Sequence, residues 1–185
     1  MTESVDLVAL QKRVQYLEDR AAVLDCVMNQ SRGHDRHDAE LMGSVYWEDG
    51  VDEHGPVVKF GPEYGEWANA AHSGVFEDHL HNITTHTCEI DGDTAHAESY
   101  VIGAMRAKGG KIVSLMGGRY IDRLERRDGV WKIALRRCTL EWMMSGDSSV
   151  MKSGAVQGFI KGKWDHSDPS YTRPLTLDGE PVERW

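Results

Sequence analysis

The order of hydrophobic patterns along the chain limits the possible folds most strongly. In residues 5 to about 33, apolar side chains recur at three- and four-residue intervals, which predicts a long amphipathic helix that Gly33 ends. From His79 onward the apolar residues alternate instead, and turn sequences follow at 91–93 and 127–129. Helices followed by a run of strands predict an α+β fold with a curved, mixed or antiparallel sheet.

Two shorter helices are expected between these regions. Asp38 is a candidate N-cap for a helix that carries Leu41, Met42 and Val45 on one side. After Pro62, which suits a first helical turn, a third helix should cover residues 63 to about 73. Trp47 begins a polar, strand-like passage. Long strands are expected at 94–105, 112–126 and 130–144.

Size and charge limit the function classes. A chain of 185 residues with 40% hydrophobic content fits one domain, predicted at 1–145, with a C-terminal extension at 146–185. The net charge of −9 argues against a nucleic-acid partner, which requires clustered Lys and Arg, and favours a neutral or weakly polar small molecule. Without an apolar run of about 18 residues or a signal-peptide pattern, the chain is expected to be cytoplasmic, with no membrane contact.

The extension at 146–185 has no periodicity but contains Phe159, Trp164, Tyr171 and Trp185. It is too aromatic for an inert disordered linker. We therefore expect it to pack on the domain, on the pocket mouth or on a neighbouring subunit.

No metal site is expected from local motifs. Cys26, Cys88 and Cys138 lie far apart without a CxxC spacing, and are interpreted as small buried hydrophobic residues. His79 and His81 would share one strand face, whereas Asp78 would point to the other, so no compact zinc ligand set forms.

An aspartate and a histidine form the candidate catalytic pair. Asp35, just beyond a helix end, and His81, early on a strand, can both point into a curved sheet, where the carboxylate would orient the imidazole as a general base. A solvated cap and an ordinary sheet histidine remain the alternatives. Strand alternation puts Arg136 and Arg137 on opposite faces, so an inward Arg136 would stabilise negative charge or form a salt bridge.

Aromatic side chains are candidates to line an apolar pocket, although core packing explains each one equally well. The candidates for substrate binding are Tyr46, Trp47, Tyr64, Trp67, Tyr100, Tyr120 and Trp142.

Several segments together resemble a known family. They are Arg20-Ala21-Ala22-Val23-Leu24-Asp25, Asp35, Tyr46-Trp47-Glu48-Asp49, Gly61-Pro62-Glu63, His81 ahead of Asp91-Gly92-Asp93, and the stretch from Gly118-Arg119-Tyr120 to Trp131-Lys132-Ile133. Residues 10–144 thus resemble the SnoaL-like branch of the nuclear transport factor 2-like (NTF2-like) superfamily. Lindane dehydrochlorinase, scytalone dehydratase and bile-acid 7α-dehydratase are similar members.

The resemblance implies a cone-shaped domain around a pocket and a lyase that needs no cofactor. Asp35 falls on the family aspartate, His81 on the family base, and Arg136 where some members place an arginine into the pocket. Gln30 stands where some dehydrochlorinases carry lysine, and Thr85 where many relatives carry Asn. The resemblance therefore favours an elimination other than chloride loss.

The sequence thus predicts a cofactor-independent lyase for a hydrophobic, ring-containing small molecule. Loss of water is the first expectation, and loss of formaldehyde from a lignin-derived aryl propanediol is the second. A ketosteroid-type isomerase, a non-catalytic binding module and a dioxygenase small subunit are the alternatives. The resemblance also implies a homodimer or homotrimer.

Overall fold

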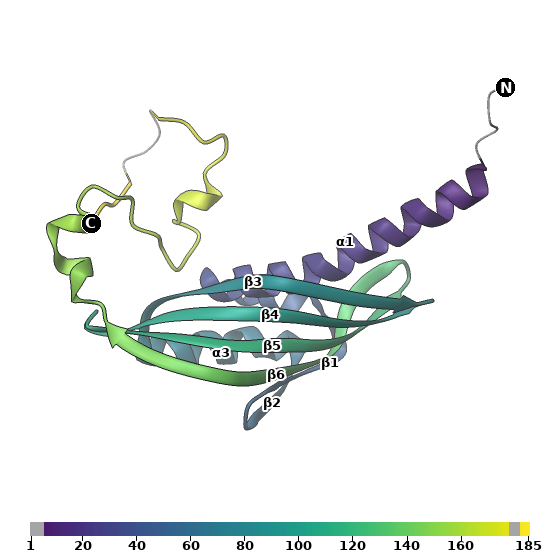
Figure 1. Cartoon of the computed structure of the whole chain (residues 1–185), viewed down its shortest axis with the longest axis horizontal. Helices are drawn as coiled ribbons and strands as arrows, with labels where there is room; N and C mark the ends of the chain where they lie inside the picture. Colours follow the sequence, from purple (N-terminus) through teal and green to yellow (C-terminus); the bar gives the residue numbers. More distant parts are fainter. Residues whose placement is uncertain (1–5, 178–181) are drawn as a thin grey trace.

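The computed structural model describes residues 6–177 and 182–185, so Val5, at the start of the expected first helix, lies outside them. Three α-helices and six strands make up the domain (Figure 1). The helices are α1 (Leu7–Asp35), α2 (Ala39–Ser44) and α3 (Gly61–Val75). The strands are β1 (Tyr46–His54), β2 (Val57–Phe60), β3 (Phe76–Asp91), β4 (Thr94–Ala107), β5 (Ile112–Arg127) and β6 (Val130–Asp147).

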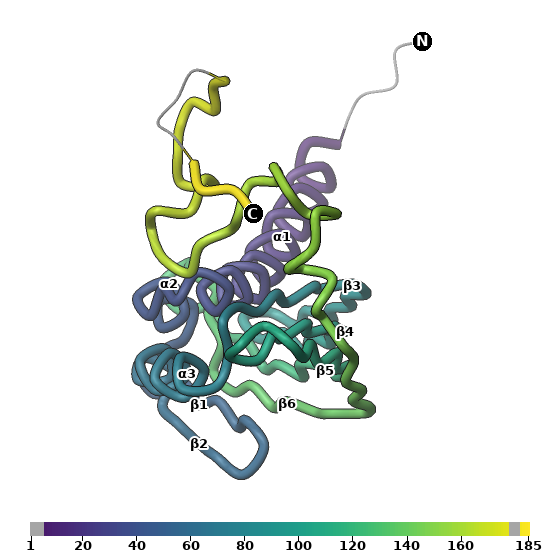
Figure 2. The backbone as a smooth tube through the Cα atoms, turned by 90° about the vertical axis from the view of Figure 1, so that its left-hand side faces the viewer, coloured from purple at the N-terminus to yellow at the C-terminus, as the bar shows by residue number. Residues whose placement is uncertain are grey.

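The strands form one mixed sheet in the order β2-β1-β6-β5-β4-β3. Only β1 and β6 pair in parallel, and the other neighbours are antiparallel. Seen along the sheet, the three helices lie together on one side of it (Figure 2). The expected α+β fold with helices in the first half is therefore confirmed.

Helix α1 has an aspartate cap and ends later than expected. The Asp6 carboxylate caps it by accepting hydrogen bonds from the backbone N–H groups of Val8 and Ala9. The helix continues two residues beyond Gly33, to Asp35. Gly33 serves packing instead of termination, because a Cβ there would lie 2.6 Å from Cγ of Met42 on α2.

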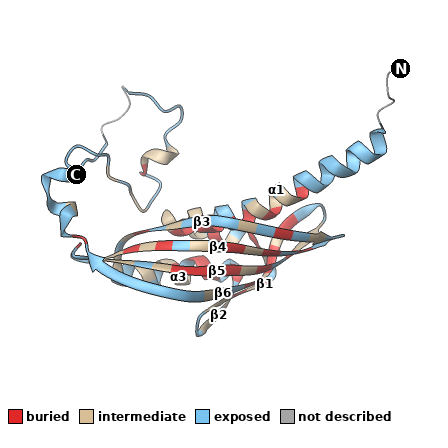
Figure 3. Ribbon diagram, in the orientation of Figure 1, coloured by how far each residue is buried: buried red, intermediate tan, exposed pale blue. Residues whose placement is uncertain are grey.

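Only the second half of α1 packs on the sheet. Val23 and Val27 are fully buried, whereas Leu7 is 72% exposed. Figure 3 shows the first turns of α1 as exposed, with buried residues only nearer the sheet. The start of α1 projects away from the sheet in Figure 1. Position along α1 therefore decides burial more than the regular apolar spacing does.

The shorter helices follow the sequence signals. Asp38 caps α2 by accepting the N–H of Leu41, and Met42 on that helix is fully buried, as expected. Helix α3 begins at Gly61, with Pro62 in its first turn. The four long strands were predicted within three residues at each end, while β2 was not expected as a separate strand.

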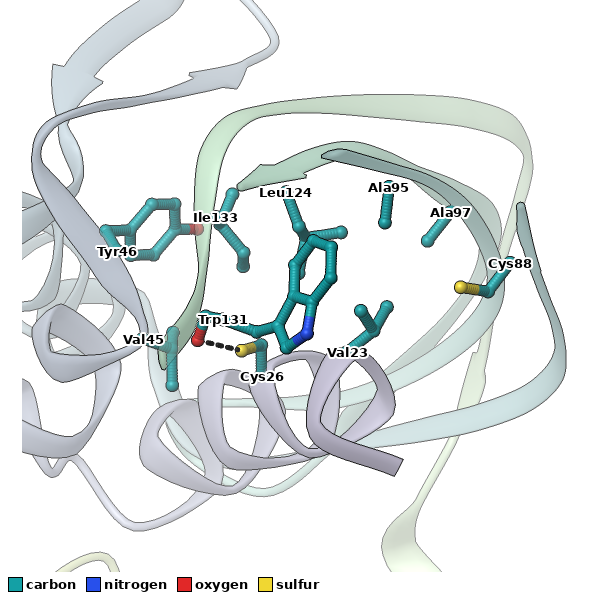
Figure 4. Close-up of a cluster of buried hydrophobic side chains, with 10 residues drawn as sticks. All are labelled: Val23, Cys26, Val45, Tyr46, Cys88, Ala95, Ala97, Leu124, Trp131 and Ile133. Carbon is teal, nitrogen blue, oxygen red and sulfur yellow. Dashed lines mark hydrogen bonds between the residues drawn. The ribbon is translucent and has the colours of Figure 1, made fainter. Parts of the chain in front are cut away.

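The main apolar core lies between α1 and the sheet (Figure 4). Trp131 of β6 packs there with Val23 and Leu124, and the Cys26 thiol donates a hydrogen bond to the Trp131 carbonyl at 3.3 Å. Cys26 and Cys88 are buried and Cys138 partly buried, and all three are free thiols. This core fixes the angle at which α1 crosses the sheet, and so the position of its last residue, Asp35.

The C-terminal segment leaves β6 and returns to the end of α1 (Figure 2). It contains the short 3-10 helices Ser149–Lys152, Gly154–Val156 and Pro169–Tyr171. The Trp164 ring stacks on His37 with 3.8 Å between centroids, and Asp168 lies 3.3 Å from Nε of Arg36.

Among the helices described, none is both long and apolar enough to cross a membrane.

Candidate functional site

Asp35 and His81 form a direct hydrogen-bonded pair. Nδ1 of His81 lies 2.7 Å from Oδ1 of Asp35, and the backbone N–H of His81 donates to both carboxylate oxygens, at 3.1 and 2.9 Å. The side chains are 7% and 13% exposed. The last residue of α1 therefore fixes both the backbone and the ring of an early residue of β3. No hydrogen bond to Nε2 of His81 is found within residues 6–177 and 182–185.

A second histidine shares the same carboxylate. Nδ1 of His79 lies 3.2 Å from Oδ1 of Asp35, and its Nε2 lies 3.2 Å from Nδ1 of His72 on α3. Burial alone would raise the pKa of Asp35, but the hydrogen bonds from His79 and His81 outweigh it and lower that pKa. Asp35 is therefore an ionised acceptor at neutral pH. His79 and His81 share one face as expected, since Leu80 between them is 52% exposed.

His34 adds a further imidazole from α1. Its ring centroid lies 5.0 Å from that of His81 and 5.4 Å from that of His72. Nε2 of His34 lies 3.0 Å from the Tyr64 hydroxyl, which also lies 3.1 Å from Nδ1 of His54. Burial lowers the pKa of His34 well below its ordinary value, so this imidazole is neutral.

Arg136 faces inward and is ion-paired. It is fully buried, and its Nε and Nη2 donate to the two oxygens of Asp122 on β5 at 2.7 and 2.6 Å. Arg137 points the other way, with 60% of its side chain exposed. Nη1 of Arg136 is buried without a hydrogen-bond partner within the described chain. The ion pair therefore leaves the Nη1 amino group of the guanidinium available.

Three of the proposed pocket tyrosines are buried near these charges. The Tyr46 hydroxyl donates to Oδ2 of Asp52 at 2.5 Å, and Tyr64 is fully buried. The Tyr120 ring lies 4.2 Å from the guanidinium carbon of Arg136. Burial raises the pKa of Tyr120 well above its ordinary value, with Asp35 adding to the rise and Arg136 opposing it. Tyr120 thus lies within electrostatic range of both groups.

The remaining aromatic candidates lie elsewhere. Trp67 on α3 is partly buried, 5.6 Å from the Tyr64 ring. Trp47 donates from Nε1 to the Glu125 carbonyl and is covered by Arg127.

Tyr100 and Trp142 are on the opposite face of the sheet from Asp35. His81 pairs with Gly103 on β4, and Tyr100, three residues away, is 47% exposed while its neighbour Ser99 is fully buried. Trp142 lies over Gly117 and, with Tyr100, lines a separate shallow hollow. A ligand held on the helix side of the sheet would not reach these two residues.

A cavity of about 950 Å³ adjoins the histidine cluster. It lies between the C-terminal segment and the ends of β3, β4 and β6, and His79 and Trp164 are on its wall. The Trp164 ring lies 4.8 Å from that of His79. His79, which is hydrogen-bonded to Asp35, therefore lines this cavity, whereas Asp35 and His81 do not.

Residues 15–137 match the family of SnoaL-like domains. The chain belongs to the SnoaL-like family. Its NTF2-like fold, recognised from the sequence, is thereby confirmed. A comparison with curated proteins finds no match.

Three solved structures illustrate the likeness of this SnoaL-like chain. A type 3 hexachlorocyclohexane dehydrochlorinase from Novosphingobium barchaimii is 24% identical, with a TM-score of 0.68 over 72% of this chain and 94% of that one. A protein provisionally named scytalone dehydratase from Novosphingobium aromaticivorans is 18% identical, with a TM-score of 0.63 over 70% and 88%. A protein of unknown function from Mycobacterium tuberculosis is 28% identical, with a TM-score of 0.60 over 68% and 77%.

Sequence reasoning missed the partners of the site residues. His72 carries no local signal on α3, and it meets His79 only because α3 leads directly into β3. Asp122, which is the register partner of Arg136 on the neighbouring strand, was also not identified from the sequence. Once the strands are aligned, a carboxylate opposite Arg136 can be expected, because a buried charge is costly unless it is paired.

Proposed function

We propose that this SnoaL-like protein is a cofactor-independent lyase that acts on a hydrophobic, ring-containing small molecule. His81 is the general base, Asp35 orients it and stabilises its charged form, and Arg136 binds an oxygen of the substrate. Tyr46, Tyr64, Trp67 and Tyr120 belong to the substrate surroundings in this proposal. Loss of water is the first reaction, and loss of formaldehyde from an aryl propanediol is the second.

The contact between Asp35 and His81 is the observation that carries the proposal. An ionised carboxylate 2.7 Å from Nδ1 makes His81 donate at that nitrogen, so the lone pair is on Nε2. The backbone bond to the same carboxylate prevents rotation of this unit. Such a fixed tautomer is what a proton-abstracting base requires.

Both reactions use that lone pair. In dehydration, Nε2 of His81 takes a proton from the carbon next to the one bearing a hydroxyl group. The C–H electrons form the double bond, the C–O bond breaks, and the hydroxyl group takes the proton back from the His81 imidazolium to leave as water. In formaldehyde loss, Nε2 takes the proton of a terminal hydroxyl, the C–C bond breaks, and the resulting carbanion is protonated in return.

Arg136 and the relatives support this class of reaction. The unpartnered Nη1 of Arg136 supplies a buried donor for an oxygen that gains negative charge. Asp122 holds the other side of the guanidinium, so that donor is fixed in place. The names of two structural relatives, a dehydrochlorinase and a scytalone dehydratase, both denote eliminations.

The test is a product assay on aromatic alcohols and aryl propanediols. Mass spectrometry would detect the loss of water, and a colorimetric assay would detect released formaldehyde. His81→Gln should lower kcat about 100- to 10,000-fold, because general-base catalysis contributes about that much. Asp35→Asn should also lower it, while His96→Gln, an exposed histidine of β4, is the matched control. Equal activity of His81→Gln and wild type would refute the base.

The same assay separates the rival functions. A ketosteroid-type isomerase would change the structure of the substrate without changing its mass. A binding module would bind ligands that no variant converts, and a dioxygenase small subunit would depend on a large partner subunit. The proposal also includes a homodimer or homotrimer, which light scattering on the purified chain would determine.

A further inference from the structure

Three imidazoles from three separate elements converge beside the proposed base. His34 of α1, His72 of α3 and His79 of β3 each offer one ring nitrogen, and these nitrogens all lie within 4.8 Å of one another. His34 and His79 are 1% exposed. Within the described residues, Nδ1 of His34 is buried and has no hydrogen-bond partner. An unpaired buried ring nitrogen is costly unless something binds it.

We propose that His34, His72 and His79 form a binding site for a divalent transition-metal cation of the Zn²⁺ class. Neutral imidazoles are the ligands these cations prefer, and three histidines with one open position are a recurrent zinc set. This site is separate from the base chemistry proposed for His81, and no step of that chemistry passes through it.

The spacing of the ring nitrogens supports the site. Nδ1 of His72 and Nε2 of His79 are 3.2 Å apart. With Zn–N bonds of about 2.0–2.1 Å, two ligands of a tetrahedral zinc are about 3.3 Å apart. These two atoms share an N–H···N hydrogen bond, which a cation would replace with little change in their separation. All three nitrogens lie within 4.8 Å of one another, so no pair must approach by more than about 1.5 Å to reach this separation.

The outer contacts of the rings fit the same site. Nδ1 of His79 remains on the Asp35 carboxylate while Nε2 faces the cation, an arrangement in which a carboxylate orients a metal-bound histidine. Nε2 of His34 remains on the Tyr64 hydroxyl while its unpartnered Nδ1 is available. Two of the three ligands thus have a partner that fixes the ring and its tautomer.

The electrostatics agree with this geometry. Burial lowers the pKa of His34 and of His79, and it lowers the pKa of His72 to about 3. Each neutral ring has one nitrogen with a lone pair, and His72 offers Nδ1 to a cation once its proton is on Nε2.

A second candidate set, Asp35 with His79 and His81, fits less well. There the carboxylate already accepts Nδ1 of both histidines and the backbone N–H of His81. A cation among these atoms would break the contacts that hold the base.

The test is a titration of chelator-treated protein with Co²⁺, followed by visible absorbance and calorimetry, with Zn²⁺ as competitor. We expect one equivalent to bind with the intense bands of a tetrahedral complex. His72→Gln should weaken binding at least 100-fold, and Tyr64→Phe about 10- to 100-fold through loss of an outer partner. His96→Gln and His81→Gln should leave the affinity unchanged, although His81→Gln removes the proposed activity.

Folding is checked independently of binding. Zn²⁺ should raise the Tm of the wild type and of His96→Gln but not that of His72→Gln, because only a cation bound to the native state stabilises it. Circular dichroism of each variant shows whether it is folded. Absence of stoichiometric binding to the wild type would overturn the site. Binding that survives His72→Gln but is lost in His81→Gln would overturn it in favour of the second set.

Discussion

Asp122 and Arg136 face each other across β5 and β6 and form a two-point ion pair inside the sheet. Their register pairing puts both side chains on the helix side, where Nε and Nη2 of Arg136 reach the two carboxylate oxygens at 2.7 and 2.6 Å. Both side chains are fully buried. Asp52, on the other neighbouring strand, is also in register with Arg136, but its carboxylate accepts the Tyr46 hydroxyl. Asp122 is therefore the carboxylate that pairs with the arginine.

We expect Asp122→Asn to lower the free energy of unfolding by about 3–5 kcal/mol. The reason is that removal of one partner leaves a charge buried without compensation. Urea denaturation measures this loss. The matched control is Glu53→Gln, which breaks the exposed pair with Arg137 and should cost about 0–1 kcal/mol. Equal effects of the two variants would mean that Arg136 is neutralised in some other way.

His54 should make stability depend on pH in the alkaline range. Burial alone would lower its pKa, but the Asp52 carboxylate 3.7 Å away and the Cys138 sulfur together outweigh it and raise the pKa of His54 to about 10, from an ordinary value of 6.5. A raised pKa stabilises the fold fully below pH 6.5, and this contribution is lost as the pH rises through about 10.

We therefore expect the stability difference between wild type and His54→Gln to be largest below pH 6.5 and to shrink toward pH 10. Urea unfolding at a series of pH values measures it, with His96→Gln as the control. A difference that stays constant over this range would show that His54 is not charged in the folded protein.

The fold could be predicted from the sequence because its signals are local. Alternating strands, turn glycines and the Asp38 cap each act within a few residues, and these elements were found close to where they were expected. Gly33 was wrongly predicted to end α1. Its missing side chain instead makes room for Met42 of α2, a contact that no local sequence rule detects. Burial along α1 could not be predicted for the same reason, since it depends on where the sheet ends.

The candidate site could be predicted only in part. Asp35 and His81 were paired from their positions at a helix end and a strand start, together with the family resemblance. The other histidines of the cluster come from elements whose contacts depend on the packing of α3. Tyr100 and Trp142 were grouped with the pocket because aromatic character does not reveal the face of a strand. The face follows from register, which a single residue type does not encode.

Cys26 should be the least reactive of the three thiols. Burial raises the pKa of Cys26 to about 12, with Asp122 adding to the rise and Arg136 opposing it. The thiolate is the reactive form, so at pH 8 Cys26 should resist a disulfide reagent until the protein unfolds. Cys138 is partly buried and Cys88 buried, so rapid labelling should reach no more than one thiol. Peptide mapping after brief labelling identifies it, and early modification of Cys26 would contradict the burial.

Trp164 should hold the C-terminal segment against the histidine cluster. Its ring stacks on His37 at 3.8 Å and lies 4.8 Å from the ring of His79, while most residues of the segment from 149 to 177 are exposed. A stacked aromatic pair contributes about 0.5–1.5 kcal/mol beyond the area it buries. Trp164→Ala should therefore open the segment and speed tryptic cleavage after Lys161 and Lys163, as mass spectrometry of a limited digest would show. Trp142→Ala, on the opposite face of the sheet, is the control. If both variants are cut at the wild-type rate, the segment is held by its ion pairs, such as that between Arg36 and Asp168, and not by the tryptophan.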